Sequence, residues 1–543
     1  MQNSSSSPSE QAAAGSSRRP RGWRVFGYFL VGAAALVTLI ALFYAEEDWR
    51  GKRAWKKYRQ EAESQGISFD LQKLIPAPVP DDQNFAMTPF LKPVLDLNPR
   101  PFTGSPWRDT NAAQRAQEFG REIIDHLKPS KPLYTDNPVQ GQLTDLPTLA
   151  SGIELDLRKM TITKTNRHAA EHLSPTNFSR TEAATYLLDY MKRYDPVLDE
   201  IRTASKQPYS RFNVHYEDED PAGILLPHLG VLKKLAHVLQ ARASSELALG
   251  KTDAAFQDVQ LIFYLGDSVK DEPIIISQLM REAIFSGVGD QIIWEGLNEH
   301  RWSDAQLQAF QKRLEEISFI KDGEKALNGE RIAFGMVFYD YVRKHPEAME
   351  NIWGGPGQPT GDIVLLRFVP DGWLYQEQIV QQHLVEKLVS AFDAEKNVIH
   401  PDIVNSVAAT THQLGGAFSR LLHHQAMVPL WLEGLSKYCQ KPPFNQNNVN
   451  ETIIACALER YRMANGKLPE TLDALSPKFL EKIPLDVCTG DAMKYRRTDD
   501  EKFLLYSVGW NEKDDGGTVV MEKNKPGTLD LLNQGDWVWP EYK

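Results

Sequence analysis

Cysteine is scarce in this chain. Its 543 residues include only Cys439, Cys456 and Cys488, which are too few for a disulfide scaffold and lack the C-x-x-C spacing of a zinc site. One interpretation is a single disulfide with one remaining thiol. The other is three buried thiols, and we favour it slightly because free cysteine is among the most buried residue types.

Basic charge is outnumbered by acidic charge. Lysine and arginine total 61 against 72 aspartates and glutamates, which gives a net charge of −11. No block of Lys and Arg alternates with aromatic residues, as a groove for single-stranded nucleic acid requires. We therefore expect no nucleic-acid partner.

Familiar catalytic motifs are also missing. The sequence contains neither H-E-x-x-H nor G-x-S-x-G. Gly250-Lys251-Thr252 lacks the earlier glycine of a phosphate loop, and Asp81-Asp82 fits a turn or helix cap better than a catalytic pair. His168 and His172 are four residues apart, yet no carboxylate completes a metal-ligand frame. We assign no catalytic residue and favour a role other than catalysis.

Long apolar runs are absent, with one exception. Residues 25–45, VFGYFLVGAAALVTLIALFYA, carry no charge over 21 residues, which is long enough to cross a bilayer as one helix that rises about 1.5 Å per residue. The run is longer than the apolar core of a signal peptide, and Phe43-Tyr44-Ala45 stands where small residues would mark cleavage. We predict an uncleaved single-pass anchor whose partner is the lipid bilayer.

The flanks of this run give conflicting signals about orientation. Four arginines ending at Arg24 precede the run and six basic residues between Arg50 and Arg59 follow it, so charge alone would place the body in the cytoplasm. Long domains cross membranes largely regardless of charge, and three acidic residues, 46–48, directly follow the run. Together with the C-terminal resemblance given below, this predicts a bacterial inner (cytoplasmic) membrane protein whose bulk is periplasmic.

The remaining segments predict a mainly α protein with a small α+β module at its end. The expected order is a disordered tail at 1–24, the transmembrane helix at 25–45, a helical stalk at 46–66, a proline-rich extended wrap at 67–176, a helical-repeat-like body at 177–440 and the α+β module at 441–543. Within the wrap, a helix is expected at 111–127.

Helical periodicity dominates the predicted body. Apolar residues at 231–249 and 253–268 flank Gly250, and this helix-turn-helix is similar to one tetratricopeptide-type hairpin. Because the repeat of about 34 residues does not recur, we expect an irregular α-solenoid or bundle. Ser303 with Gln306 predicts a capped helix start, and 351–370 predicts a surface loop. Helical surfaces of this kind bind other proteins, so a protein partner is expected on the body.

The last hundred residues change character. An apolar helix face ends at Asn465-Gly466, which is a suitable left-handed cap. Residues 493–496 and 503–507 alternate as the two strands of a hairpin. Turn residues follow at 514–517, Asp-Asp-Gly-Gly.

This end of the chain resembles the globular head of the major pseudopilins of type II secretion systems. The motifs are A-L-E-R-Y-R-M-A-N-G-K-L-P-E-T-L at 457–472, K-I-P-L-D at 482–486, Y-R-R at 495–497 and L-Y-S-V-G-W-N-E-K-D-D-G-G at 505–517. The resemblance covers about 70 residues and implies a small α+β fold outside the cytoplasm. The chain departs from the family in lacking a prepilin cleavage site. As a whole it resembles membrane-anchored proteins of planctomycete and verrucomicrobial bacteria.

The same resemblance implies a calcium site. The pseudopilin loop binds calcium through aspartates and backbone carbonyls, which correspond here to Asp514 and Asp515 and to Ser507 or Val508. Calcium prefers six to eight oxygen ligands, and Thr518 to Val520 stand where a further aspartate would help. The alternative is a plain hairpin turn at 514–517, which we prefer of the two.

Three classes of function stay open on the sequence. A membrane-anchored scaffold that binds another protein is favoured by the architecture. An accessory component of a secretion or pilus-like system is the second, because the C-terminal module resembles a pseudopilin head. A membrane-anchored hydrolase of an unrecognised type is the third.

Overall fold

The computed structural model describes residues 21–99, 104–127, 141–163, 173–216, 223–346, 369–412, 424–425, 427–498, 502–522, 529–530 and 535–540. The fold is mainly helical, with 64% helix and 5% strand, which confirms the mainly α class. Residues 1–20 of the predicted tail lie outside the described part of the chain. Residues 21–24, which were also assigned to the tail, belong to the first helix.

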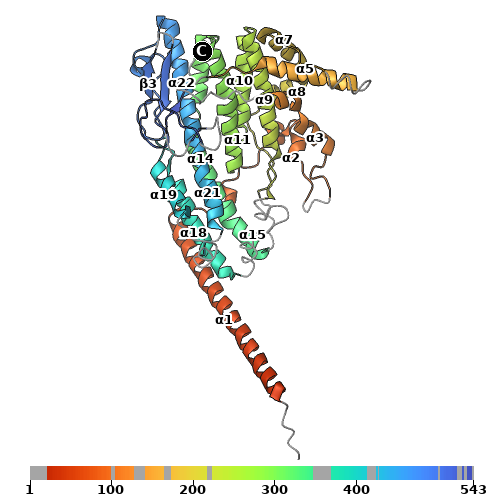
Figure 1. The fold of residues 1–543 in the computed structure, drawn as a ribbon, viewed down its shortest axis with the longest axis vertical. Helices are drawn as coiled ribbons and strands as arrows, with labels where there is room; N and C mark the ends of the chain where they lie inside the picture. The colour runs from red at the N-terminus through yellow and green to blue at the C-terminus, as the bar shows by residue number, and fades with distance from the viewer. Residues whose placement is uncertain are drawn as a thin grey trace, which may run out of the picture.

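The first helix, α1 (Arg21–Ser64), is 44 residues long. Its apolar half has a mean hydropathy of 2.3 and none of that window is buried in the protein, so the helix is long and apolar enough to cross a membrane. Figure 1 shows this half as a rod that projects from the end of the helical body near α15 and α18. One continuous helix therefore contains both the predicted span and the segment after it.

The second half of α1 lies against the body along α18 (Asp371–Val389). Trp55, Tyr58 and Ala62 are buried there, and the two helices approach so closely that a β-carbon on Gly51 would lie 2.2 Å from the Gly372 carbonyl oxygen. The predicted stalk is thus helical, but it is not a free rod. The reason is that its apolar residues recur at helical spacing on one face.

The proline-rich region packs on the body as an ordered wrap. Phe85, Leu91 and Val94 are buried in the same core as the central helices. Its elements are η1 (Leu71–Lys73), η2 (Asp81–Gln83), η3 (Phe85–Met87), α2 (Lys92–Leu95), α3 (Thr110–Glu118), α4 (Arg121–His126) and α5 (Leu146–Thr163). The helix predicted at 111–127 is interrupted, because Gly120 adopts φ +65° between α3 and α4.

One wrap helix was not predicted. The 18-residue α5 begins at Leu146 and has Pro147 at its second position. Proline is tolerated in the first turn, where its missing N–H would have no helical partner.

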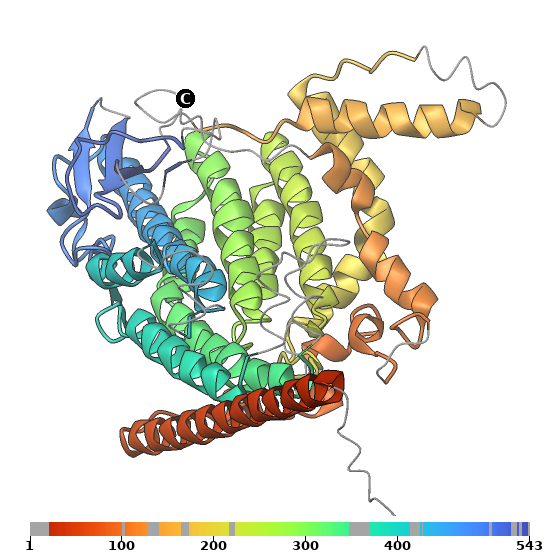
Figure 2. The same ribbon diagram turned by 60° about the horizontal axis from the view of Figure 1, so that its bottom comes forward.

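The centre of the molecule is a set of packed helices. They are α7 (Arg180–Met191), η4 (Lys192–Tyr194), α8 (Asp195–Ala204), α9 (Pro227–Ala248) and α10 (Thr252–Asp267). The predicted hairpin is confirmed: Gly250 adopts φ +70° between α9 and α10, and Ala255 is fully buried. Figure 2 shows α9 and α10 side by side in the middle of the fold.

The next helices are joined by two short π-helical segments. The order is α11 (Ile275–Ile284), η6 (Phe285–Gly289), α12 (Asp290–Asn298), α13 (Asp304–Leu314), α14 (Phe319–Ile332), η7 (Ala333–Val337) and α15 (Phe338–Lys344). The predicted start of α13 is confirmed as a capping box between Ser303 and Gln306. Residues 351–368 of the predicted loop lie outside the described part of the chain, which resumes at residue 369.

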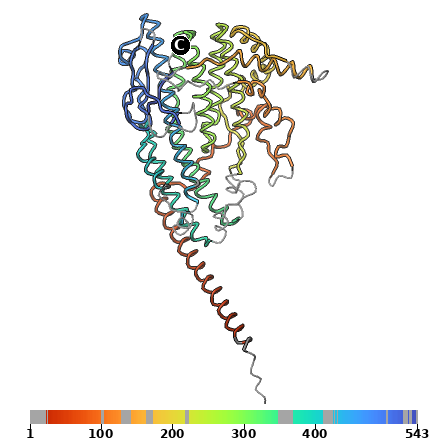
Figure 3. Tube along the Cα trace, in the orientation of Figure 1, coloured from red at the N-terminus to blue at the C-terminus, as the bar shows by residue number. Residues whose placement is uncertain are grey.

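The chain then passes α18, a short hairpin of β1 (Phe392–Asp393) and β2 (Val398–Ile399), α19 (Pro401–His412) and α21 (Val428–Tyr438). The last long helix, α22 (Lys441–Asn465), ends at Gly466 with φ +76°, as predicted. Figure 3 traces the chain from α1 at one end of the molecule to this C-terminal region at the other.

The C-terminal module places a three-stranded antiparallel sheet beside α22. Its elements are η9 (Leu472–Leu475), β3 (Lys494–Arg497), β4 (Phe503–Ser507) and β5 (Trp537–Val538), with strand order β3-β4-β5. Tyr495 pairs with Leu505, which confirms the predicted hairpin. Strand β5 was not predicted. The three cysteines are free and buried, which confirms the favoured interpretation.

Candidate functional site

The larger of two hollows described here lies between the proline-rich wrap and the segment after α8. We call it the proline groove; its volume is about 650 Å³, and it is lined by Gln72, Ile75, Pro76, Ala77, Pro78, Arg211, Asn213, Val214, His215 and Tyr216. Apart from Gln72 in η1, the lining residues belong to segments that are neither helix nor strand. Prolines at 76, 78 and 80 impose this conformation, because each fixes φ and disfavours helix before it.

Hydrogen bonds hold the two walls of the proline groove in place. The Arg211 Nε atom donates to the Pro76 carbonyl oxygen at 2.9 Å. Asn84 donates from its side-chain Nδ2 to the Arg211 carbonyl at 2.8 Å and accepts from the Arg211 backbone N–H at 2.8 Å. The backbone N–H of Phe85 donates to the Tyr209 carbonyl at 2.9 Å. The groove is therefore preformed.

The chemistry of the proline groove suits a polypeptide better than a reaction. Its ten lining residues include Arg211, His215 and Tyr216, and none of them is an aspartate, glutamate, serine, threonine or cysteine. Burial raises the pKa of Tyr216 well above its usual range, which keeps its hydroxyl neutral. Grooves with aromatic side chains are among the surfaces that dock extended peptides.

The four residues predicted to bind calcium fall into two pairs with different surroundings. Ser507 is fully buried, and its Oγ accepts from Asn447 Nδ2 at 2.8 Å and from the Gly509 N–H at 3.0 Å. The Val508 N–H donates to Asp486 Oδ2 at 2.9 Å. These two residues therefore belong to the interface between β4 and α22.

Asp514 and Asp515 lie in the surface loop after β4. Asp514 Oδ1 accepts from the Tyr506 hydroxyl at 2.8 Å, and its Oδ2 lies 3.4 Å from Lys494 Nζ. The Tyr506 hydrogen bond is the main reason that the pKa of Asp514 is lowered. Asp515 Oδ2 accepts from Asn511 Nδ2 at 3.0 Å. The two carboxylates thus have separate partners.

The loop is organised by a third aspartate that the sequence did not single out. The Asp536 carboxylate accepts from the N–H groups of Gly517 at 2.6 Å and of Asp515 at 3.2 Å. Burial raises its pKa to about 6. Asp536 stands 21 residues after Asp515, at the start of β5, so only the pairing of β5 with β4 reveals it.

A metal would require this loop to rearrange. In the described ranges, no group of three or more His, Cys, Asp or Glu side chains is arranged to hold an ion. Calcium binding by Asp514 and Asp515 stays a prediction, and Asp536 joins them as a candidate ligand.

Three buried polar side chains of the helical body, His228, Glu272 and Ser277, form a hydrogen-bonded set. His228 Nε2 lies 2.9 Å from Glu272 Oε1, and the Ser277 hydroxyl donates to the other oxygen of Glu272. The carboxylate stands between the serine and the histidine, so the histidine does not activate the hydroxyl as it would in a hydrolase triad.

Comparison with known proteins finds no relative: no family model, no curated protein and no solved structure matches the chain. Function is therefore argued from the geometry above.

Proposed function

We propose that the protein is a single-pass membrane-anchored scaffold that holds its helical body close to a bacterial cytoplasmic membrane, on the periplasmic side, and binds a protein partner there. The observation that carries this proposal is the continuity of α1. Its first half is apolar and wholly exposed, while its second half is part of the protein core. A helix used in both ways fixes the body relative to the bilayer.

The coupling begins directly after the apolar run. Asp48 Oδ1 accepts from the Gly372 N–H at 2.8 Å, and Glu47 Oε2 accepts from Trp373 Nε1 at 3.1 Å. Farther along, the Tyr58 hydroxyl donates to Glu386 Oε1 at 2.5 Å. Because Glu47 lies two residues after Ala45, there is little flexible chain between the span and the body.

The proline groove supports the partner part of the proposal. It is preformed, it is open to solvent at Asn213, and its lining includes the aromatic ring of Tyr216. An ordered groove of this kind binds an extended segment of another protein with little loss of its own conformational entropy.

Site-specific photocrosslinking in intact cells tests the partner. A photoreactive side chain at Asn213 should give one adduct of defined mass, and the same probe at Lys312, exposed on α13, should not. Gln72→Trp, which fills the groove while leaving the bond between Arg211 and Pro76 intact, should abolish the adduct. Equal labelling from both positions would reject the groove as the binding surface.

A topology reporter tests the orientation. A fusion after Lys543 of an enzyme that is active only outside the cytoplasm should be active. Activity from a cytoplasmic reporter alone would overturn the periplasmic placement.

An accessory role in a secretion or pilus-like system is the second candidate. It is supported by the C-terminal arrangement of a long helix, α22, beside the antiparallel strands β3, β4 and β5, which is compatible with the small α+β head that the sequence resembles. Co-purification of the protein with secretion components would favour this role.

A further inference from the structure

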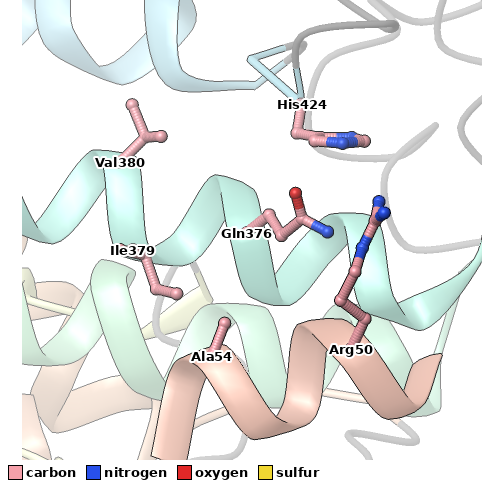
Figure 4. Close-up of a pocket in the computed structure, with 6 residues that line it drawn as sticks. All are labelled: Arg50, Ala54, Gln376, Ile379, Val380 and His424. Carbon is pink, nitrogen blue, oxygen red and sulfur yellow. The ribbon is translucent and has the colours of Figure 1, made fainter. Parts of the chain in front are cut away.

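A second hollow lies where α1 leaves the apolar run and meets α18. We call it the interfacial groove; its volume is about 370 Å³, and it is lined by Arg50, Ala54, Gln376, Ile379, Val380 and His424. Figure 4 shows the Arg50 side chain extended toward His424, with the Gln376 amide directed toward the space beside them. No carboxylate is among the six lining residues.

The position of Arg50 along α1 sets its depth, if the proposed anchoring holds. It stands five residues after Ala45, which is about 7.5 Å along a helix. The headgroup layer on each side of the hydrocarbon core is about 5–7 Å thick. The α-carbon of Arg50 therefore stands at the outer edge of the headgroup layer. Its side chain points back along the helix to Glu47, which brings the guanidinium to the level of the lipid phosphates.

Aromatic side chains connect the apolar run to the interfacial groove. The rings of Phe43 and Trp373 are 6.2 Å apart, and the rings of Trp373 and His424 are 4.8 Å apart. Tryptophan is enriched at the membrane–water interface because its ring is apolar with a polar N–H. This row independently places the groove at the bilayer surface.

Arg50 is oriented for a phosphate. Its Nη2 donates to Glu47 Oε2 at 2.7 Å, and this is its one hydrogen bond among the described residues. Glu47 is itself buried and also accepts from Trp373. The guanidinium is thereby held in place while its side chain stays 53% exposed, which leaves its other N–H groups to bind two oxygens of one phosphate.

The rest of the groove strengthens such a contact. Ala54, Ile379 and Val380 supply the apolar part of the groove lining, on the side away from the guanidinium, where it suits the apolar part of a lipid. Gln376 adds an uncharged amide donor. Further basic residues on α1, among them Lys52 and Arg53, favour an anionic membrane surface.

We infer that the interfacial groove is a binding site for the phosphate of an anionic phospholipid, held by Arg50 and Gln376. The ligand comes from the bilayer and not from solution, because the groove opens at headgroup depth. This inference rests on the proposed anchoring by α1 but not on the protein partner.

Lipid retention by the full-length chain tests the inference. The protein is inserted into nanodiscs of phosphatidylcholine with 30% phosphatidylglycerol, released into mild detergent, and analysed by native mass spectrometry. Wild type should retain at least one phosphatidylglycerol, and Arg50→Gln should lose most of it. Lys52→Gln is the matched control, since it removes the same charge from an exposed position about 200° around the helix.

A second variant removes a groove contact without changing charge. Gln376→Leu leaves the pair of Arg50 and Glu47 intact and should lower retention several-fold, so it decides the case if Arg50→Gln does not fold.

Added inorganic phosphate should not displace the lipid; full displacement would indicate a soluble phosphate site and overturn the inference. Equal lipid retention in Arg50→Gln and Lys52→Gln would also overturn the inference. The same holds if Gln376→Leu folds and retains the lipid normally, so that only Arg50→Gln loses it. Failure to insert into nanodiscs would instead reject the anchoring.

Discussion

The two longest helices of this protein are used in opposite ways. Half of α1 is exposed and apolar, and its other half joins the body through one face. By contrast, α22 is buried over most of its length, and polar side chains such as Asn447, Glu451 and Arg460 are buried with it. Packing of apolar surface is enough to dock a helix, whereas the hydrogen bonds of α22 determine which strands and loops lie beside it.

Asn447 is the strongest test of this difference. Its Nδ2 donates to Ser507 Oγ at 2.8 Å and to Asp486 Oδ1 at 3.1 Å, and its Oδ1 accepts from the Val487 N–H at 3.0 Å. Asn447→Leu removes three buried hydrogen bonds at once and takes away the acceptor of the Val487 N–H, so we expect a loss of about 4 kcal/mol of stability. Hydrogen exchange at 503–508 should accelerate strongly.

Asn465→Ala is the matched control on the same helix. Asn465 is exposed, and its Nδ2 donates only to the Tyr461 carbonyl among the described groups. Its loss should cost less than about 0.5 kcal/mol. If the two variants lose similar amounts of stability, the buried hydrogen bonds of Asn447 do not position the strands and loops beside α22.

Glu377 is a buried carboxyl on α18, the helix against which α1 packs. Its Oε1 accepts from the N–H groups of Met427 and Val428 at the start of α21, and burial raises its pKa to about 7 from about 4.5. The folded state therefore binds a proton that the unfolded state releases between pH 4.5 and 7, so stability from this group is present at low pH and is lost as pH rises through 7.

Glu377→Gln keeps the accepting oxygen but cannot ionise. It should match wild type near pH 4 and exceed it at pH 8, by up to about 3 kcal/mol for a shift of this size. Melting temperatures measured across this pH range check the sign. A variant that is less stable at pH 8 would mean that the ionised carboxylate is needed to cap α21.

Tyr58 tests the docked half of α1. Tyr58→Phe removes the bond to Glu386 while keeping the ring in its place beside Trp55 and Phe69. Because this bond has a carboxylate acceptor, we expect a loss of about 1.5 kcal/mol, together with a wider distribution of spin-label distances between α1 and α18.

The exposed half of α1 supplies the control. Tyr28 is 77% exposed, and Tyr28→Phe should leave both the stability and the spin-label distances unchanged. If Tyr58→Phe behaves like Tyr28→Phe, α1 and α18 are held together by apolar packing alone.

The sequence was sufficient for features with local causes. The apolar run, the cap at Ser303, the turn at Gly250 and the end of α22 at Gly466 each depend on a few neighbouring residues. It was insufficient where distant segments meet. The docking of Tyr58 on Glu386 spans 328 residues, and both grooves combine walls that are far apart in the chain.

The candidate calcium loop shows the same limit. Asp514 and Asp515 were found from local turn chemistry and a family resemblance. Asp536 reaches them only through the pairing of β4 with β5, in which Ser507 is opposite Trp537.

Calcium should give the smallest effect of the four tests. Binding would require Asp514 to give up its bonds with Tyr506 and Lys494, so we expect weak affinity, with a dissociation constant of about 1 mM as in extracellular modules. At about 1 mM calcium the gain in stability is RT ln 2, or about 0.4 kcal/mol. A thermal melt of the full chain with calcium or chelator measures this gain in stability, with magnesium as the ion control.

The double variant Asp514→Asn, Asp515→Asn should lose this gain while its calcium-free melting temperature stays unchanged, because asparagine keeps an accepting oxygen for Tyr506. A wild type that does not respond even to about 20 mM calcium, well above this affinity class, would establish the loop as a plain turn around Asp536, whereas an equal response in the variant would place the ion elsewhere.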